Sequence, residues 1–438
     1  MRSDVEFLDV QIVDLTHDGK GVADLGERRV FVPGALPGER VRLTLRRRRR
    51  QYHEADLIEI LEPSVERVEP PCKYFGRCGG CAVQHFSYEA QVTFKQTIVQ
   101  EALSRIAGVE PEVWLEPILG SQWNYRRRAR LGVRFVKGKD RVLVGFKERA
   151  TRYVTDMVSC RVLVKPLDKL PGELSDAIGE TSLRQRLPQV EVSAGENVRA
   201  AVLRVLNDPT EDDLSIFRDL GRQQELDVYL QRAGPGTIRA IDPSGVGQLA
   251  YSLPDFDLTL HFSPTDFLQV NAEVNAALVT QTLRLLEVQK NDRVLDLYCG
   301  LGNFSLPLAR HAGEVLGVEG ESGLVARAAG NAHLNKIDNV SFIAGDLNQL
   351  EWSFMRGAWD LVVLDPPRSG AQAVVSQMAQ IAPRRIAYVS CHPATLARDA
   401  KELIKSAGYQ LIAVGIADMF PHTHHVESIA LFEKSKGI

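Results

Sequence analysis

The last third of the chain alternates short apolar runs with longer amphipathic segments, and this alternation restricts the folds open to it. Strands separated by helices pair in parallel, and the resulting sheet buries both of its faces. The pattern from about residue 266 therefore predicts a doubly wound α/β domain over residues 266–438. The expected strands cover 293–298, 314–319, 340–343, 359–365 and 385–390, followed by two later runs at 410–416 and 427–432 that are candidates for an antiparallel edge.

The first 62 residues follow a different pattern, in which short strand-like runs are separated by glycine and proline. Several short strands with such turns favour a small β-barrel. The run from Arg40 to Arg50 holds seven arginines and no acidic residue. Because a basic patch on a small barrel is a common design for binding nucleic acid, we expect this region to contact RNA or DNA.

Residues 63–265 lie between these two regions and are less regular. A polar, proline-containing linker at 63–71 leads into a cysteine-rich segment, and a strand-rich stretch begins near residue 125. We therefore expect three domains, with boundaries at 1–62, 63–265 and 266–438. A second basic cluster begins the strand-rich stretch and consists of Arg126, Arg127, Arg128, Arg130 and Arg134.

The overall charge points away from a nucleic-acid partner, because 53 basic and 56 acidic residues give a formal net charge of −3. The two arginine clusters oppose that reading, since phosphate binding depends on local charge. The composition is that of a globular protein, with 44% hydrophobic and 25% charged residues. No apolar run approaches the ~18 residues of a membrane span, and the polar N-terminus has no signal-peptide pattern. We expect a cytoplasmic protein.

A glycine-rich turn follows the strand at 293–298, in the segment Asp296-Leu-Tyr298-Cys299-Gly300-Leu-Gly302-Asn303. Glycine at positions 300 and 302 lets the backbone approach a ligand closely before the next helix. Glu319, at the end of the second strand, is placed to bind ribose hydroxyls, and Asp346, beyond the third, to reach an adenine edge. This combination fits S-adenosylmethionine better than NAD.

A cysteine and a glutamate are the candidates for the chemistry. Cys391 directly follows a strand, at the edge of the sheet where active sites form, and the turn at His392-Pro393 exposes its thiol. With Glu427 as a base, this pair suggests carbon methylation of a pyrimidine. The thiolate would add to C6, C5 would attack the methyl group, and the base would remove the C5 proton. A metal site built from His422, His424 and His425 lacks regular ligand spacing.

The segment Asp365-Pro-Pro-Arg368 ends the fourth strand. Methyltransferases that act on exocyclic amines often carry an aromatic residue at the fourth position of such a motif, where it stacks on the flipped base. Arg368 at that position argues against an amine target.

Three cysteines, Cys72, Cys78 and Cys81, are clustered, and Cys160 follows 79 residues after the last of them. Four cysteines can hold zinc or an iron–sulfur cluster. Only one pair has the C-x2-C spacing of a zinc knuckle, and the glycines at 79 and 80 allow close approach, so the pattern favours a 4Fe-4S cluster. Because all four ligands would come from the protein, we expect a structural or RNA-positioning role.

These motifs together resemble, over essentially the whole chain, the S-adenosylmethionine-dependent RNA uracil-C5 methyltransferases, and most closely the bacterial enzymes acting on large-subunit rRNA. The resemblance implies an N-terminal OB-like TRAM barrel, a β-rich central domain with the cluster and a C-terminal Rossmann-like class I methyltransferase domain. It implies that the four cysteines are the cluster ligands, and that the segment at 90–121 packs on the catalytic domain. The matching motifs include Phe267-x-Gln269-x-Asn271, Ser390-Cys391-x-Pro393 and Phe420-Pro-x-Thr-x-His-Val-Glu427.

The resemblance also implies roles for single residues. Cys391 would be the nucleophile and Glu427 the base, while Phe267 and Arg368 would hold the flipped uracil. His392 departs from the asparagine usual after the nucleophile, and Tyr298 stands where phenylalanine is common. The residues expected to bind S-adenosylmethionine are Gln269, Tyr298, Asn303, Glu319, Asp346 and Asp365.

The expected activity is methyl transfer from S-adenosylmethionine to C5 of a specific uridine in 23S rRNA, through a covalent bond between Cys391 and C6. We expect a monomer whose partner is rRNA, with the uridine single-stranded or flipped out of its stack. One alternative is a tRNA uridine as target, although the tRNA-directed relatives generally lack the barrel and the cluster. Another is an RNA-binding protein whose methyltransferase domain is vestigial.

Overall fold

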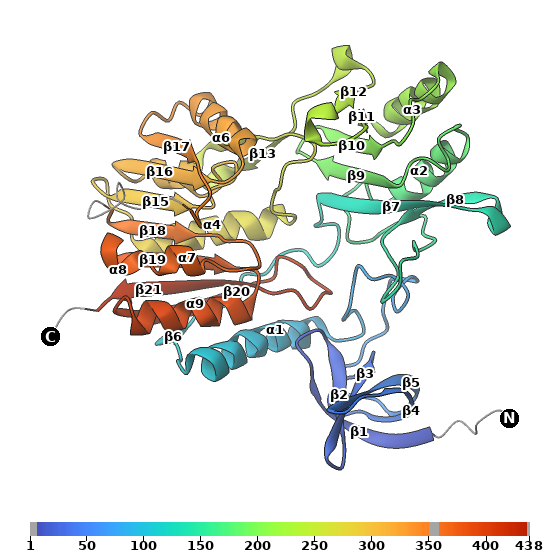
Figure 1. Ribbon diagram of the computed structural model, residues 1–438, viewed down its shortest axis with the longest axis horizontal. Coiled ribbons are helices and arrows are strands. Elements are labelled where there is room, and N and C mark those ends of the chain that lie inside the picture. The colour runs from blue at the N-terminus through green and yellow to red at the C-terminus, as the bar shows by residue number, and fades with distance from the viewer. Residues whose placement is uncertain (1–6, 350–358, 436–438) are drawn as a thin grey trace. The chain divides into compact units, whose positions relative to one another are not determined.

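A computed structural model describes residues 7–349 and 359–435, and the chain folds into two compact units (Figure 1). The first unit consists of Met1–Ile98, Lys147–Thr155 and Phe420–His425, and the second of Val99–Phe146, Asp156–Met419 and Val426–Ile438. Along the chain, the first boundary falls within helix α1 (Tyr88–Ala102). Each unit is therefore built from segments far apart in the sequence.

The first unit begins with a closed five-stranded barrel, which confirms the expected small β-barrel. Its strand order is β1-β2-β3-β5-β4, and only β3 and β5 pair in parallel. Alternate residues point inward, and Ile12, Val30, Val41 and Leu43 lie in the core. The strands are β1 (Phe7–Leu15), β2 (Lys20–Leu25), β3 (Arg28–Pro33), β4 (Arg40–Arg48) and β5 (Tyr52–Glu62).

A buried ion pair ties the segment after the barrel to the barrel itself. The carboxylate of Glu39, fully buried, accepts hydrogen bonds from the backbone N–H of Leu36 at 2.8 Å and from the Arg67 guanidinium at 2.5 and 2.9 Å. Arg67 also donates to the carbonyl of Gly34 at 2.7 Å. A buried carboxylate satisfied in this way keeps its charge, so the linker is held in one position.

The arginine run of the barrel is less uniformly basic than its sequence suggests. Arg40 pairs with Glu62 at 2.7 Å, Arg42 pairs with Asp9 and Glu59, and Arg46 pairs with Glu54 at 3.2 Å. The acidic partners come from β1 and β5, which flank β4 in the barrel. At least three of the seven arginines therefore face carboxylates, so the run is less basic than its sequence suggests.

The second unit contains a six-stranded sheet of order β12-β11-β10-β9-β7-β8, with α2 (Leu170–Gly179) and α3 (Glu211–Gln224). A capping box starts α3, because Thr210 and Asp213 exchange hydrogen bonds. A hairpin of β13 (Ala250–Leu253) and β14 (Leu258–His261) follows. The sheet strands are β7 (Arg128–Val136), β8 (Arg141–Gly145), β9 (Gln189–Ala194), β10 (Arg199–Arg204), β11 (Asp227–Gln231) and β12 (Arg239–Ala240), and short helical turns occupy Leu103–Ala107 (η1), Lys137–Lys139 (η2), Pro235–Thr237 (η3), Pro243–Gly245 (η4) and Pro254–Phe256 (η5).

An eight-stranded sheet forms the other part of the second unit, in the order β17-β16-β15-β18-β19-β21-β20-β6. The first five strands of that order are parallel, as the sequence predicts for a doubly wound sheet, and β21 is antiparallel to both of its neighbours. The strands are β15 (Arg293–Leu297), β16 (Glu314–Glu319), β17 (Val340–Ala344), β18 (Leu361–Leu364), β19 (Arg385–Ser390), β20 (Tyr409–Ala417), β21 (Glu427–Lys434) and β6 (Val113–Trp114). The helices are α4 (Ala272–Leu286), α5 (Ser305–Ala309), α6 (Ser322–Leu334), α7 (Gln372–Val375), α8 (Met378–Ile381) and α9 (Pro393–Lys405).

The short strand β6 is the outermost strand, so β20 and β21 lie inside the sheet and do not form its edge. β6 pairs in parallel with β20, and Ile118 forms a further bridge to Ala417. The expectation that the segment at 90–121 packs on the catalytic domain agrees with this pairing for residues 113–118, whereas its residues up to Ile98 belong to the first unit. No helix in the described part of the chain is both long and apolar enough to cross a membrane.

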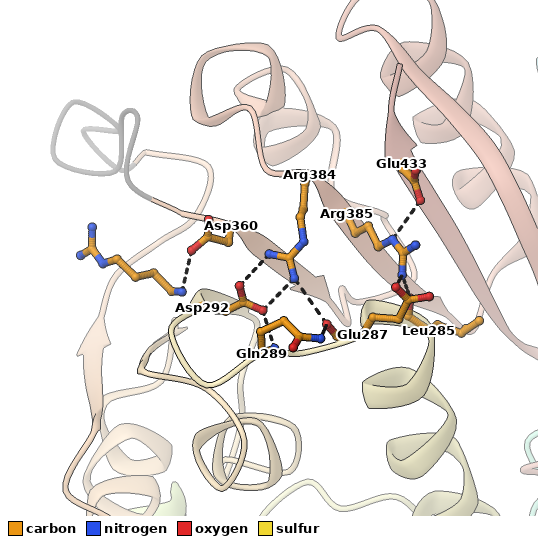
Figure 2. Close-up of polar contacts among 9 residues, drawn as sticks. Leu285, Glu287, Gln289, Asp292, Asp360, Arg384, Arg385 and Glu433 are labelled. Atoms are coloured by element: carbon orange, nitrogen blue, oxygen red, sulfur yellow. Dashed lines mark hydrogen bonds and ion pairs between the residues drawn. The ribbon is translucent and has the colours of Figure 1, made fainter. Parts of the chain in front are cut away.

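Ion pairs hold the amino ends of the central strands, at the edge opposite the carboxyl ends (Figure 2). Arg384 donates to both carboxylate oxygens of Asp292, at 2.8 and 2.7 Å, and Asp360 accepts from the backbone N–H of Arg293 at 2.8 Å. Arg385 bridges Glu433 and Glu287, each at 2.9 Å. These ion pairs anchor the amino ends of the strands. In sheets of this kind, ligands bind at the opposite edge, where the carboxyl ends of the strands lie.

Candidate active site

The nucleophile and base candidates meet at the carboxyl edge of the eight-stranded sheet. Antiparallel pairing sets Ser390 of β19 opposite Ser428 of β21. Cys391 is the residue after Ser390 and Glu427 is the residue before Ser428, so both leave the paired strands at the same end. Cys391 is partly exposed, whereas Glu427 is 3% exposed. The register thus places a reachable thiol beside a buried carboxyl group.

Burial and like charge keep protons on this site. Burial, the charge of Glu427 and then that of Asp365 raise the pKa of the Cys391 thiol to about 11, and Arg368 opposes the shift. Burial and Asp365 raise the pKa of Glu427 well above its ordinary value. Burial and the charge of Asp296 raise the pKa of Asp365 to about 7. Only roughly one part in ten thousand of a thiol with such a pKa is ionised at pH 7, so the thiol of the unliganded site holds its proton.

His392 caps the helix that follows the nucleophile. Its Nδ1 atom accepts from the backbone N–H of Thr395 at 3.4 Å, and its backbone carbonyl accepts from the Thr395 hydroxyl at 3.0 Å. Asparagine is a common capping residue, so His392 performs here a task that asparagine also performs. The positive end of α9 therefore lies next to Cys391, where it favours a thiolate.

The loop that carries Arg368 is fastened to α9 through Asp399. The Oδ2 atom of this buried carboxylate accepts from the backbone N–H of Ala371 and from the Tyr388 hydroxyl, both at 2.7 Å. Arg398 adds a bond to the carbonyl of Ser369 at 3.0 Å. These contacts fix the backbone on the carboxyl side of exposed Arg368. Nothing in the sequence marked Asp399, which lies on an ordinary amphipathic helix.

The glycine-rich turn after β15 has the open backbone expected of a ligand cradle. Tyr298, Gly300 and Gly302 all have positive φ, at 70°, 54° and 89°. The carboxylate of Glu319 accepts from the backbone N–H of Gly300 at 3.1 Å. Burial, followed by charges that include Asp346 and Glu319, raises the pKa of Tyr298 to about 12. The structure therefore gathers Tyr298, Glu319 and Asp346 around one turn.

Asn303 is held by two residues that the sequence did not single out. It exchanges two hydrogen bonds with Asn275 of α4, each 3.0 Å long, and its Oδ1 atom also accepts from the Tyr251 hydroxyl at 3.0 Å. Asn275 lies one helical turn after Asn271, so the helix face could have indicated it. Tyr251 lies on the distant hairpin and carried no such signal. Together they orient the amide of Asn303.

The segment at 267–271 connects the two sheets of the second unit. Gln269 Nε2 donates to Asp365 Oδ2 at 3.5 Å, and Asn271 caps α4 by accepting from the backbone N–H of Val274 at 3.3 Å. Phe267 is 64% exposed, so it is not a core residue and its ring is free to stack on a base. Arg127 donates from Nε to the Gln269 carbonyl at 2.8 Å, a contact that the sequence did not predict.

Three of the candidate cluster ligands lie in the first unit. Cys78 Sγ accepts a hydrogen bond from the backbone N–H of Gly80 at 3.4 Å. Burial, together with Cys72, raises the pKa of the Cys78 thiol, and this hydrogen bond is among the interactions that oppose the shift. Arg149 donates to the carbonyls of Cys81 at 2.5 Å and Cys78 at 3.4 Å. These thiols, N–H donors and cation fit an anionic iron–sulfur cluster.

The fourth candidate, Cys160, is buried in the second unit. Over residues 7–349 and 359–435, no group of three or more His, Cys, Asp or Glu side chains is gathered as a metal site. The structure therefore leaves the iron–sulfur expectation without direct support.

Comparison with known proteins agrees with this geometry. Residues 87–435 match the family model described as tRNA (uracil-5-)-methyltransferase, and residues 8–65 match the TRAM domain of tRNA (uracil(54)-C(5))-methyltransferase. The chain is 47% identical over 427 residues to the 23S rRNA (uracil(1939)-C(5))-methyltransferase RlmD of Nitrosococcus oceani, covering 96% of this chain and 95% of the relative. It is 47% identical to the same enzyme of Thiobacillus denitrificans, covering 97% and 99%.

Among solved structures, the chain resembles the tRNA (uracil-54, C5)-methyltransferase of Pyrococcus abyssi in complex with S-adenosyl-L-homocysteine. The TM-score is 0.75 and the identity 25%, over 97% of this chain and 99% of the other. This tRNA enzyme matches nearly the whole chain, and the matching TRAM model also belongs to a tRNA enzyme, so the barrel by itself does not separate rRNA from tRNA enzymes.

Proposed function

This chain belongs to the uracil-5-methyltransferase family, and on that premise we propose that it methylates C5 of a specific uridine in 23S rRNA. The relatives named for 23S rRNA are 44–47% identical over nearly their full length, whereas the tRNA enzyme of known structure is 25% identical. Identity therefore favours rRNA over tRNA. The observation that carries the chemistry is the β19–β21 register, which sets Cys391 beside Glu427.

In the proposed reaction, S-adenosylmethionine supplies the methyl group as an electrophile. The Cys391 thiol gives its proton to solvent as its sulfur bonds to C6 of the uracil, and the electron pair of the C5–C6 double bond moves onto the C4 carbonyl oxygen as an enolate. C5 of the enolate then bonds to the methyl carbon while the bond between that carbon and the sulfonium sulfur breaks, which leaves S-adenosylhomocysteine. Glu427 takes the proton from C5, the bond between sulfur and C6 breaks, and the electron pair returns to the thiolate. The raised pKa makes the ionised Glu427 a stronger base, and the carboxyl group must give up its own proton before it can take the one from C5.

The other candidate residues complete the proposed site. Phe267 would stack on the flipped uracil, and Arg368 would bind its carbonyl oxygens or an adjacent phosphate. The hydrogen bond between Gln269 and Asp365 supports a shared place for these two residues at the reacting atoms. The residues proposed to bind S-adenosylmethionine are Gln269, Tyr298, Asn303, Glu319, Asp346 and Asp365.

Two variants test the mechanism with a labelled 23S rRNA fragment. Cys391→Ala should abolish methyl transfer and form no covalent complex. Glu427→Gln should still attack, but it should accumulate a protein–RNA adduct that survives denaturing electrophoresis. Methyl transfer at the wild-type rate in both variants would refute the mechanism. Mass spectrometry of 23S rRNA from a deletion strain should show one uridine that has lost its 5-methyl group.

A tRNA uridine remains the second candidate, favoured by the descriptions of the two family models. Methylation of tRNA transcripts but not of rRNA fragments would establish it. A vestigial domain is disfavoured because the cysteine, the glutamate and the glycine-rich turn are all in place. Calorimetry that detects no S-adenosylmethionine binding would reverse that judgement.

We also propose a 4Fe-4S cluster held by Cys72, Cys78, Cys81 and Cys160. The donor set around the first three cysteines supports it, and Cys160 rests on the sequence resemblance alone. The cluster would act as a structural element. Protein purified without oxygen should contain iron and sulfide and show visible absorbance, which Cys78→Ser should abolish. Zinc in elemental analysis, with no such absorbance, would overturn the proposal.

The remaining proposals concern the whole protein. We propose that the protein is cytoplasmic, because its proposed substrate is rRNA. We propose that it is a monomer, because one chain supplies both Cys391 and Glu427. We propose domains at 1–62, 63–265 and 266–438. Sedimentation should show a single species of 48.6 kDa.

A further inference from the structure

A cavity lies in the second unit, and one of its lining residues adjoins the segment that carries Gln269. Its volume is about 250 Å³, and Arg127, Lys165, Glu196, Arg199, Ser252 and Ala272 are among its lining residues. Ala272 begins α4, directly after the segment that carries Gln269. The backbone N–H of Arg127 donates to the carbonyl of Val270 at 2.9 Å, so the cavity wall and that segment are hydrogen-bonded to each other.

Arg127 differs from the other lining residues, because it is 5% exposed and forms no ion pair within 4 Å among the described residues, although the charge of Glu196 partly offsets its burial. Its Nε atom donates to the Gln269 carbonyl, and its guanidinium lies 4.5 Å from the centre of the Tyr251 ring. Its Nη2 atom is buried without any hydrogen-bond partner in the described structure. Burial lowers its pKa to about 10, so the side chain remains charged at neutral pH. A buried cation with unused donors is costly unless an anion satisfies it.

The other charged residues of the wall add to this positive character. Lys165 is exposed and makes no ion pair within the described part of the chain. Arg199 pairs at 2.9 Å with Glu225, whose side chain is 79% exposed. The only carboxylate named above, Glu196, is turned to the wall, since it accepts from the backbone N–H and hydroxyl of Ser252 at 2.7 and 2.9 Å. Three cations thus line the cavity against one committed carboxylate.

We propose that this cavity binds a backbone phosphate of the RNA strand that carries the target uridine. The inference rests on the proposed function and adds to it a substrate contact away from the reacting base. A guanidinium fork matches phosphate oxygens, and phosphate contacts set the position of a strand while base contacts set its specificity. Because Arg127 is bonded to both Gln269 and Val270, a phosphate held here would position the strand relative to the residues proposed to meet the uracil.

The first test measures the affinity of a 23S rRNA fragment containing the target uridine as a function of salt. Lys165→Gln should weaken binding at low salt and reduce the slope of log K against log salt by about 0.7–0.9, the value for one lost phosphate contact. Lys169→Gln is the matched control, since Lys169 is an exposed lysine four residues away that does not line the cavity. Arg127→Lys keeps the charge but loses the fork, and it should weaken binding while thermal unfolding shows that it folds.

The second test identifies the phosphate. The fragment is made with an uncharged methylphosphonate at one linkage at a time near the uridine. At one linkage the substitution should weaken binding to the wild type but cause no further loss in Lys165→Gln. Such non-additivity indicates a direct contact, and a merely structural role for Lys165 would not produce it.

Separate outcomes distinguish the two proposals. No binding or methylation of the fragment by the wild type would defeat the proposed function itself. Normal methylation, with an unchanged salt slope in Lys165→Gln and no linkage showing non-additivity, would overturn the phosphate site alone. A different outcome is that inorganic phosphate raises the unfolding temperature of the wild type but not of Arg127→Lys, while Lys165→Gln keeps the wild-type salt slope and no linkage shows non-additivity. That result would identify a site for a small free anion and also overturn the proposal.

Discussion

Replacing Asp399 by alanine tests how the loop that carries Arg368 is held. The change removes the partner of two buried donors, the Tyr388 hydroxyl and the Ala371 N–H, which bond to Asp399 at 2.7 Å each, and it also breaks the more exposed ion pair with Arg398. Tyr388 is fully buried and Ala371 is 1% exposed, so water cannot replace the lost partner without rearrangement. At about 1–3 kcal/mol for each buried unsatisfied group, Asp399→Ala should cost roughly 2–6 kcal/mol of folding free energy.

Tyr388→Phe is the matched variant, because it removes one of these bonds and leaves the bond to Ala371. It should cost only about 1 kcal/mol and leave the loop in place. Denaturant unfolding of both single variants and the double variant gives their coupling, which we expect to be about 0.5–3 kcal/mol. Because Arg368 is proposed to hold the base, the KM for RNA should rise in Asp399→Ala but not in Tyr388→Phe. A loss below about 0.5 kcal/mol in Asp399→Ala, typical of a surface change, would refute this account.

Three further predictions concern the thiol, the cofactor turn and the strand ends. Because the pKa of Cys391 is raised to about 11, its alkylation by iodoacetamide, followed by mass spectrometry, should accelerate about tenfold per pH unit from pH 7 to 9, and a plateau in that range would contradict the shift. Tyr251→Phe removes the 3.0 Å bond to Asn303 and should weaken S-adenosylmethionine binding by about 2- to 10-fold in calorimetry; an unchanged Kd would show that this bond does not orient the amide. Burial raises the pKa of Asp292, but the hydrogen bonds and charge of Arg384 outweigh it, so the pKa is lowered. Asp292→Asn should therefore lower the free energy of unfolding by about 1–3 kcal/mol at pH 7. That difference should shrink as the pH falls below about 4, where the unfolded chain takes up the proton first, and it should vanish once the pH is below the lowered pKa of the folded carboxylate. Equal losses at about pH 7 and pH 2 in unfolding experiments would count against an ionic contribution.

Local patterns were enough to predict the elements near the site. The strand at 314–319 has the expected limits, and the glycine turn after 297 has the positive φ values that glycine at 300 and 302 allows. Cys391 and Glu427 were predicted as a pair from their residue types and a family resemblance. These features depend on neighbours in the sequence, or on motifs that a family carries unchanged.

Charge was the property that the sequence described least well. The run from Arg40 to Arg50 contains no acid, yet Asp9 and Glu62 reach it because barrel closure places β1 and β5 on either side of β4. The cluster near residue 130 divides in a similar way. Arg128 and Arg130 share Glu191 of the adjacent strand β9, while Arg127 points to the opposite face of the sheet and is buried.

The sequence by itself determined that a parallel sheet would carry a glycine-rich turn and a cysteine at its carboxyl edge, because both follow from local periodicity and composition. Only the tertiary structure decided which side chains meet there. Tyr251 reaches Asn303, Asp399 holds the loop at 371, and Arg127 lies beside Gln269 with a buried Nη2 atom that has no hydrogen-bond partner in the described structure. The physical reason is that a side chain's partners are set by strand order and register, which bring together residues tens to hundreds of positions apart, and the burial of those partners then sets their pKa values.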